Sequence, residues 1–144
     1  MTVPSFTTTD AVPAASTGPI VLLVAEASPY RRLLTALIEF IGCRPVVMEP
    51  GRAAVEYARA NPPAMVLMSL FETEAPVIDT ATLIRTHLRA LTPPMIALVD
   101  VTCPKRRAAL ERLAFDAVEP KLFDVQTLED LVEGVIYAPD LCRH

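Results

Sequence analysis

Glycine is scarce in this chain, with four residues in 144, and tryptophan is absent. The four glycines are scattered (Gly18, Gly42, Gly51, Gly134), so no glycine-rich loop of the kind that binds nucleotide phosphates is present. The chain also lacks an apolar run near the roughly 20 residues needed to span a bilayer. Its first residues do not combine a basic region with a hydrophobic one, which argues against a secretory signal. We therefore expect a cytoplasmic protein without a membrane segment.

Sites built from cysteine, histidine or clustered basic residues are also disfavoured. The three cysteines (Cys43, Cys103, Cys142) are odd in number and lack metal-type spacing, which predicts reduced thiols and no metal centre. The histidines, His87 and His144, have no pattern that would make either a catalytic base. A net charge of −4 and a pI near 5.1 argue against a general nucleic-acid surface. We expect neither a cofactor nor a nucleic-acid partner.

What the chain does contain is proline, with fourteen residues that mostly fall where structural elements should start or stop. The length predicts one domain. Residues 1–19, rich in Thr, Ser, Ala and Pro, are expected to form a flexible arm, and residues 139–144 a short tail. The folded domain is then expected over residues 20–138.

Five short, mostly apolar segments alternate with helical patterns along that domain. Strands are predicted at residues 20–24, 44–48, 64–69, 95–99 and 117–119. Helices are predicted between them: one capped by Ser28, one from Gly51 to Asn61, and others at residues 80–90, from Pro104 and at 124–137. Five strand–helix repeats predict an α/β fold with a doubly wound, five-stranded parallel sheet. The apolar residues expected on the inner helix faces include Leu33, Leu34, Ile38, Ala54, Val55, Ala58, Ala108, Leu110, Leu113, Leu128 and Val132.

The central strand ends on Ser69. Open parallel sheets carry their chemistry just beyond the carboxyl ends of their strands, so Ser69 occupies the place where an active residue is expected. A serine hydroxyl is a poor nucleophile unless a base removes its proton.

Several segments resemble the receiver domain of two-component response regulators. They are Val-Leu-Leu-Val24, the run from Ser28 to Leu34, the run from Asn61 to Leu67, and Lys121-Leu122-Phe123. Val99 lies thirty residues after Ser69 and Lys121 fifty-two after it, close to the intervals in that family. The resemblance covers about residues 19–138 and implies a flavodoxin-like strand order of 2-1-3-4-5.

The chain departs from the family pattern where the family reacts. The resemblance places Ala25 and Glu26 at the two acidic positions that hold Mg²⁺ and Ser69 at the phosphate-accepting aspartate. It places Val99 at the hydroxyl residue that contacts the phosphoryl group and Val118 at the switch aromatic. Only Glu26 and Lys121 remain of the reacting set. These positions together imply a pseudo-receiver with no phosphotransfer, no metal and no catalytic residue.

Other acidic and nucleophilic residues have ordinary interpretations. Asp79 or Thr80 is expected to cap a helix, and Cys103 to be an unreactive thiol. Asp100 is either an exposed loop residue or a carboxylate that enters the pocket from a new direction. We expect Lys121 to form a salt bridge with Glu26, because a desolvated ammonium group requires a partner.

The remaining functional expectation is protein binding. The helix from Pro104 carries Lys105, Arg106, Arg107 and Arg112, which suit an acidic partner or the Glu129, Asp130 and Glu133 group of a second copy. Arg31 and Arg32 start the first helix. The resemblance implies a histidine kinase, phosphotransferase or output domain as partner. It also allows a homodimer through the helix 4–strand 5–helix 5 face, which here is formed by the helix from Pro104, the strand at 117–119 and the helix at 124–137. Two alternatives stay open: phosphate acceptance at an unorthodox residue, and small-ligand binding in the altered pocket.

Overall fold

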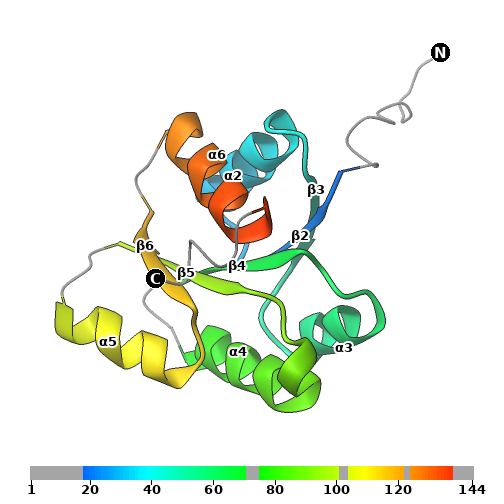
Figure 1. Ribbon diagram of the computed structural model, residues 1–144, viewed down its shortest axis with the longest axis vertical. Coiled ribbons are helices and arrows are strands. Elements are labelled where there is room, and N and C mark those ends of the chain that lie inside the picture. The colour runs from blue at the N-terminus through cyan, green and yellow to red at the C-terminus, as the bar shows by residue number, and fades with distance from the viewer. Residues whose placement is uncertain (1–17, 71–74, 101–103, 122–123, 138–144) are drawn as a thin grey trace.

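The computed structural model describes residues 18–70, 75–100, 104–121 and 124–137 (Figure 1). Its centre is a five-stranded parallel sheet in the order β3-β2-β4-β5-β6. This order is the predicted 2-1-3-4-5, so the fold prediction is confirmed. The strands are β2 (Ile20–Val24), β3 (Arg44–Met48), β4 (Met65–Ser69), β5 (Met95–Val99) and β6 (Ala117–Pro120).

Helices cover both faces of the sheet. One face is covered by α2 and α6, and the other by α3, α4 and α5 (Figure 1). Their bounds are α2 (Pro29–Phe40), α3 (Arg52–Ala60), α4 (Ala75–Leu88), α5 (Pro104–Leu113) and α6 (Val125–Val132), with a short 3₁₀ turn η1 (Arg89–Leu91) and a π-helical turn η2 (Glu133–Tyr137). In the described part of the chain, no helix is long and apolar enough to cross a membrane.

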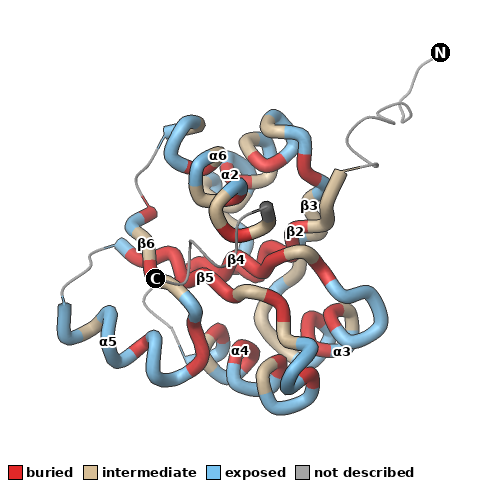
Figure 2. Tube along the Cα trace, viewed as in Figure 1, coloured by how far each residue is buried: buried red, intermediate tan, exposed pale blue. Residues whose placement is uncertain are grey.

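The strand alternation divides the core into two layers. Leu22, Val24, Val66 and Met68 face the layer under α3, α4 and α5, whereas Leu23 belongs to the layer under α2 and α6. All residues of β4 and β5 are buried, as Figure 2 shows for the centre of the sheet. Continuous apolar runs are what a strand covered on both faces requires.

Helix α2 begins as predicted but exposes one residue that was expected in the core. The Ser28 hydroxyl accepts a hydrogen bond from Arg31 N at 3.1 Å, and Pro29 occupies the first turn. Gly42 follows the helix with a φ of +91°, a conformation that favours glycine. Leu34 and Ile38 are buried, but Leu33 is exposed because it lies on the flank of the apolar stripe.

Helix α4 begins five residues earlier than predicted, at Ala75 instead of Thr80. Thr80 is buried inside the helix, where its hydroxyl donates to Pro76 O at 2.7 Å. The expectation that Asp79 caps this helix is therefore wrong: Asp79 is an exposed residue of its second turn.

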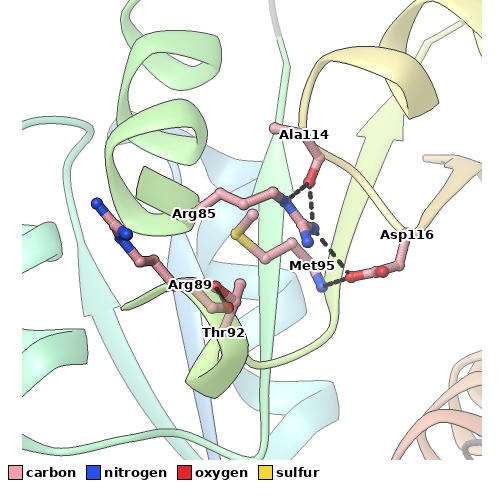
Figure 3. Close-up of polar contacts among 6 residues, drawn as sticks. All are labelled: Arg85, Arg89, Thr92, Met95, Ala114 and Asp116. Carbon is pink, nitrogen blue, oxygen red and sulfur yellow. Dashed lines mark hydrogen bonds and ion pairs between the residues drawn. The ribbon is translucent and has the colours of Figure 1, made fainter. Parts of the chain in front are cut away.

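Helix α5 contributes less to the core than expected. Of the three apolar residues predicted to face inward, only Leu110 is buried, and Ala108 and Leu113 are exposed. Polar contacts connect the turn after α5 to Arg85 of α4 (Figure 3). The Arg85 guanidinium donates to Ala114 O and contacts Asp116 Oδ2 at 3.2 Å, and the same carboxylate oxygen accepts Met95 N at 2.8 Å.

The sheet begins just before β2. Pro19 O accepts a hydrogen bond from Arg44 N at 2.8 Å, so Pro19 already extends the pairing between β2 and β3. The expectation of an arm therefore concerns residues 1–17, which lie outside the described residues, as does the expected tail at 139–144.

Candidate functional site

The carboxyl edge of the sheet brings four of the predicted pocket residues onto neighbouring strands. Ala25 follows β2, Ser69 ends β4, Val99 ends β5 and Lys121 follows β6. The strand register extends to this edge, with Lys121 N donating to Val99 O at 2.8 Å and Ala25 N donating to Met48 O at 3.0 Å. The backbone hydrogen bonds of the sheet therefore fix where each residue lies.

Ser69 is enclosed. Its side chain is 1% exposed, and its Oγ has no hydrogen-bond partner among the described residues. Ala25 and Val99, at the ends of adjacent strands, are also buried and add only apolar surface. A serine hydroxyl is a weak nucleophile unless a base removes its proton. Among the described residues, none accepts a hydrogen bond from Ser69 Oγ.

Lys121 forms an ion pair with Asp100. Its Nζ lies 3.5 Å from Asp100 Oδ1. The expected bridge from Lys121 to Glu26 stays a prediction. Asp100 directly follows β5, and Lys121 directly follows β6, so adjacent parallel strands place the two charges at one level. Both interpretations of Asp100 hold in part: its side chain is 72% exposed, and its Oδ1 also reaches the pocket lysine.

Tyr30 covers the lysine from the start of α2. The phenol donates to Lys121 O at 3.1 Å, and Lys121 Nζ lies 5.6 Å from the ring centroid, within cation–π range. Sequence reasoning missed this residue. The signal for it was an aromatic side chain in the first turn of a helix that starts at the carboxyl edge of the sheet.

Burial shifts the pKa values of Lys121 and Tyr30. Lys121 is 5% exposed, and this desolvation lowers its pKa, while the negative charge of Asp100 acts in the opposite direction. Burial also raises the pKa of the Tyr30 phenol, and Asp100 adds to that increase. Tyr30 therefore stays a neutral hydrogen-bond donor at neutral pH.

The residues present do not fit the Mg²⁺ site of a receiver. Mg²⁺ needs oxygen ligands that include one or two carboxylates. At the three positions that the resemblance assigns to carboxylates, this chain has a methyl group (Ala25), a carboxylate (Glu26) and a buried hydroxyl (Ser69). Within the described ranges, no group of three His, Cys, Asp or Glu residues could hold a metal ion.

The predicted interaction residues differ in how available they are. Arg32, Lys105 and Arg112 are exposed, and so are Asp130 and Glu133 on the other side of β6. Arg31 is half-buried because its guanidinium donates to Ala25 O at 3.0 Å.

Two further basic residues of α5 have local contacts. Arg107 is exposed, and its guanidinium donates to Val118 O at 2.6 Å. Arg106 is half-buried. Cys103, expected to be unreactive, lies outside the described residues.

No protein-family model and no curated protein matches the sequence. Solved structures do match. The receiver domain of a sensor histidine kinase from Pseudomonas aeruginosa PAO1, which has a magnesium ion in its active-site cleft, is 20% identical with a TM-score of 0.74, covering 84% of this chain and 99% of that one. A Francisella response regulator receiver domain is 16% identical with a TM-score of 0.73, covering 85% and 99%.

A response regulator from Thermotoga maritima is 17% identical with a TM-score of 0.71, covering 83% of this chain and 98% of that chain. These identities are too low to transfer an activity, but the agreement in topology extends over the whole domain. The chain therefore has the fold of the response regulator receiver domains.

Proposed function

We propose that this chain is a pseudo-receiver: a protein-interaction module of two-component signalling that works without accepting phosphate. The observation that carries the proposal is the enclosed, neutral Ser69 at the end of the central strand, where its side chain is 1% exposed. An aspartate at this position would be ionised at neutral pH and could attack phosphorus without a base.

The surrounding residues support the same conclusion. Val99 has no hydroxyl with which to contact a phosphoryl group, and Ala25 cannot bind a metal ion. Lys121, the one cation that the resemblance places in the pocket, is paired with Asp100 and covered by Tyr30. A bound phosphate would have to displace a carboxylate that the chain itself supplies.

In this proposal, the function of the chain is to bind another protein through its exposed surface. The exposed cations Lys105 and Arg112 of α5, and Arg32 of α2, suit an acidic surface on a cytoplasmic kinase, phosphotransferase or output domain. The alternative partner is a second copy, with α5 facing the acidic residues of α6.

Phosphorylation is tested by incubating the full chain with acetyl phosphate and Mg²⁺, and separately with a phosphorylated histidine kinase, followed by intact mass spectrometry. We expect no phosphoryl adduct. The positive control is the triple variant Ala25→Asp, Ser69→Asp and Val99→Thr, which restores two carboxylates and the hydroxyl and is expected to gain one acid-stable adduct that hydroxylamine removes. Stoichiometric labelling of the unmodified chain would overturn the proposal.

Surface use is tested by reversing charge on α5. Lys105→Glu with Arg112→Glu is expected to weaken capture of a partner recovered with the wild-type chain, because both side chains are exposed and like charges then oppose each other. The matched control is Arg52→Glu on α3, an exposed arginine on a helix away from α5. Equal recovery by all three proteins would exclude the α5 surface.

A further inference from the structure

Helix α2 exposes an apolar line that its own core does not use. Leu33 is 54% exposed and Phe40 is 77% exposed, and Ala36 between them is also exposed. The core contacts come from a different side of the helix, through Leu34 and Ile38. Large apolar side chains exposed in one row favour a contact with another protein surface.

The spacing of this line is that of a helix–helix contact. Positions 33, 36 and 40 follow each other at three and four residues, which is the a, d, a pattern of a coiled-coil seam. The middle position is alanine, whose small side chain permits a second helix to approach closely. The seam lies within the twelve residues of α2.

Two charged residues flank the seam on its solvent side. Arg32 and Glu39 are both exposed and are seven residues apart, so they lie on the same side of the helix, two turns from each other. Within the described residues, neither side chain forms an ion pair. When two copies of such a helix pack antiparallel, each Arg32 faces Glu39 of the second copy.

We propose that α2 binds α2 of a second copy of this chain in an antiparallel, two-fold symmetric contact. The seam residues Leu33, Ala36 and Phe40 pack against each other, and two equivalent Arg32–Glu39 pairs select the antiparallel orientation. Val47 on the edge strand β3 adds a further exposed apolar side chain on the sheet face that α2 covers. Two helical turns form a small interface, so the dimer is concentration-dependent.

The contact is independent of the chemistry at Ser69. It also covers Arg32, so a dimer formed in this way competes with any partner that docks on the start of α2. Failure of the phosphorylation test and failure of self-association are therefore separate results.

Sedimentation velocity on the full chain, from about 5 to about 500 µM, is the test. The wild-type chain is expected to shift from monomer to dimer, and Phe40→Glu to stay monomeric at every concentration. Phe40 is exposed, so this variant should fold, which its circular dichroism and thermal midpoint check. Leu91→Glu, at an exposed leucine outside α2, is the matched control and should dimerise like wild type.

A charge exchange tests the orientation. Arg32→Glu is expected to raise the dimer dissociation constant at least about tenfold, because two glutamates then face each other. Adding Glu39→Arg to that variant should restore dimerisation. A monomeric wild-type chain, a dimer that survives Phe40→Glu, a dimer lost through Arg112→Glu, or no rescue by the double exchange would each overturn the proposal.

Discussion

Lys121 and Asp100 form an ion pair between the ends of two adjacent strands, with Nζ 3.5 Å from Oδ1. The pair is asymmetric: the lysine side chain is 5% exposed, whereas the aspartate side chain is 72% exposed. Lys121 therefore bears most of the desolvation cost of the pair. The charge of the hydrated Asp100 carboxylate offsets part of that cost. This relationship makes the stability of the fold depend on the protonation of one lysine.

The pH dependence of stability should report this lysine. Burial lowers the folded-state pKa of Lys121 below its ordinary 10.5, so the unfolded chain binds more protons in the range between the two values. The free energy of unfolding contributed by Lys121 must then rise as pH increases toward 10.5. We expect wild type to gain stability relative to Lys121→Met up to about pH 10, above which tyrosines ionise. Urea denaturation at several pH values measures it.

Asp100→Asn separates the pair from burial alone. At neutral pH it should lower the free energy of unfolding by about 0.5 kcal/mol, a small value because the carboxylate is well exposed. The same substitution in the Lys121→Met background should have no effect. Equal losses in both backgrounds would show that Asp100 acts through something other than Lys121.

Ser69→Ala should not destabilise the chain. The serine hydroxyl is buried without a hydrogen-bond partner in the described part of the structure, so its removal relieves a desolvated polar group. We expect the free energy of unfolding to be unchanged or to increase by up to about 1 kcal/mol. Thermal and urea denaturation check this. A loss above about 1 kcal/mol would mean that the hydroxyl makes a stabilising contact.

The contact between α4 and the turn before β6 should be measurable as a coupling energy. Arg85 and Asp116 are 3.2 Å apart, and Asp116 also accepts the backbone N–H that begins β5. Arg85→Met and Asp116→Asn should each cost about 1 kcal/mol, and together less than the sum. Additive losses would contradict a direct interaction. The exposed Arg52–Glu56 pair on α3 is the control, with little coupling expected.

Gly18→Ala should be one of the more damaging small substitutions. A Cβ at this position would lie 2.0 Å from the carbonyl oxygen of Gly42, so the backbone has to move. We expect a loss of about 1–3 kcal/mol by urea denaturation. Ala53→Ser, at an exposed position of α3, should change stability by less than about 0.5 kcal/mol. A Gly18→Ala variant as stable as this control would show that the approach can relax.

The fold could be predicted because its signals are local and repeated. Each buried strand is an apolar run, and α2 starts at a serine followed by proline, so the sheet order followed from the resemblance and the repeat. The start of α4 could not be predicted in this way. Thr80 looks like a cap in sequence, but inside the helix its hydroxyl bonds to the carbonyl one turn earlier.

The site was only partly predictable for a related reason. The strand ends placed Ala25, Ser69, Val99 and Lys121 together, but the partner of Lys121 depends on side-chain reach between elements. Asp100 and Glu26 are both acidic residues close to strand ends, and only the three-dimensional structure shows that Asp100 reaches Lys121. The exposure of Leu33 and Leu113 likewise depends on how α2 and α5 are rotated over the sheet.

The hydrogen bond from Tyr30 to the carbonyl of Lys121 joins residues ninety-one positions apart. Contacts of such long sequence separation form late and slow the folding of a domain. On the ribosome, α2 leaves the exit tunnel long before β6 is synthesised, so the nascent chain carries an incomplete sheet edge until translation of the domain is almost finished. The contact between Tyr30 of α2 and Lys121 after β6 therefore forms only when the last strand has been synthesised.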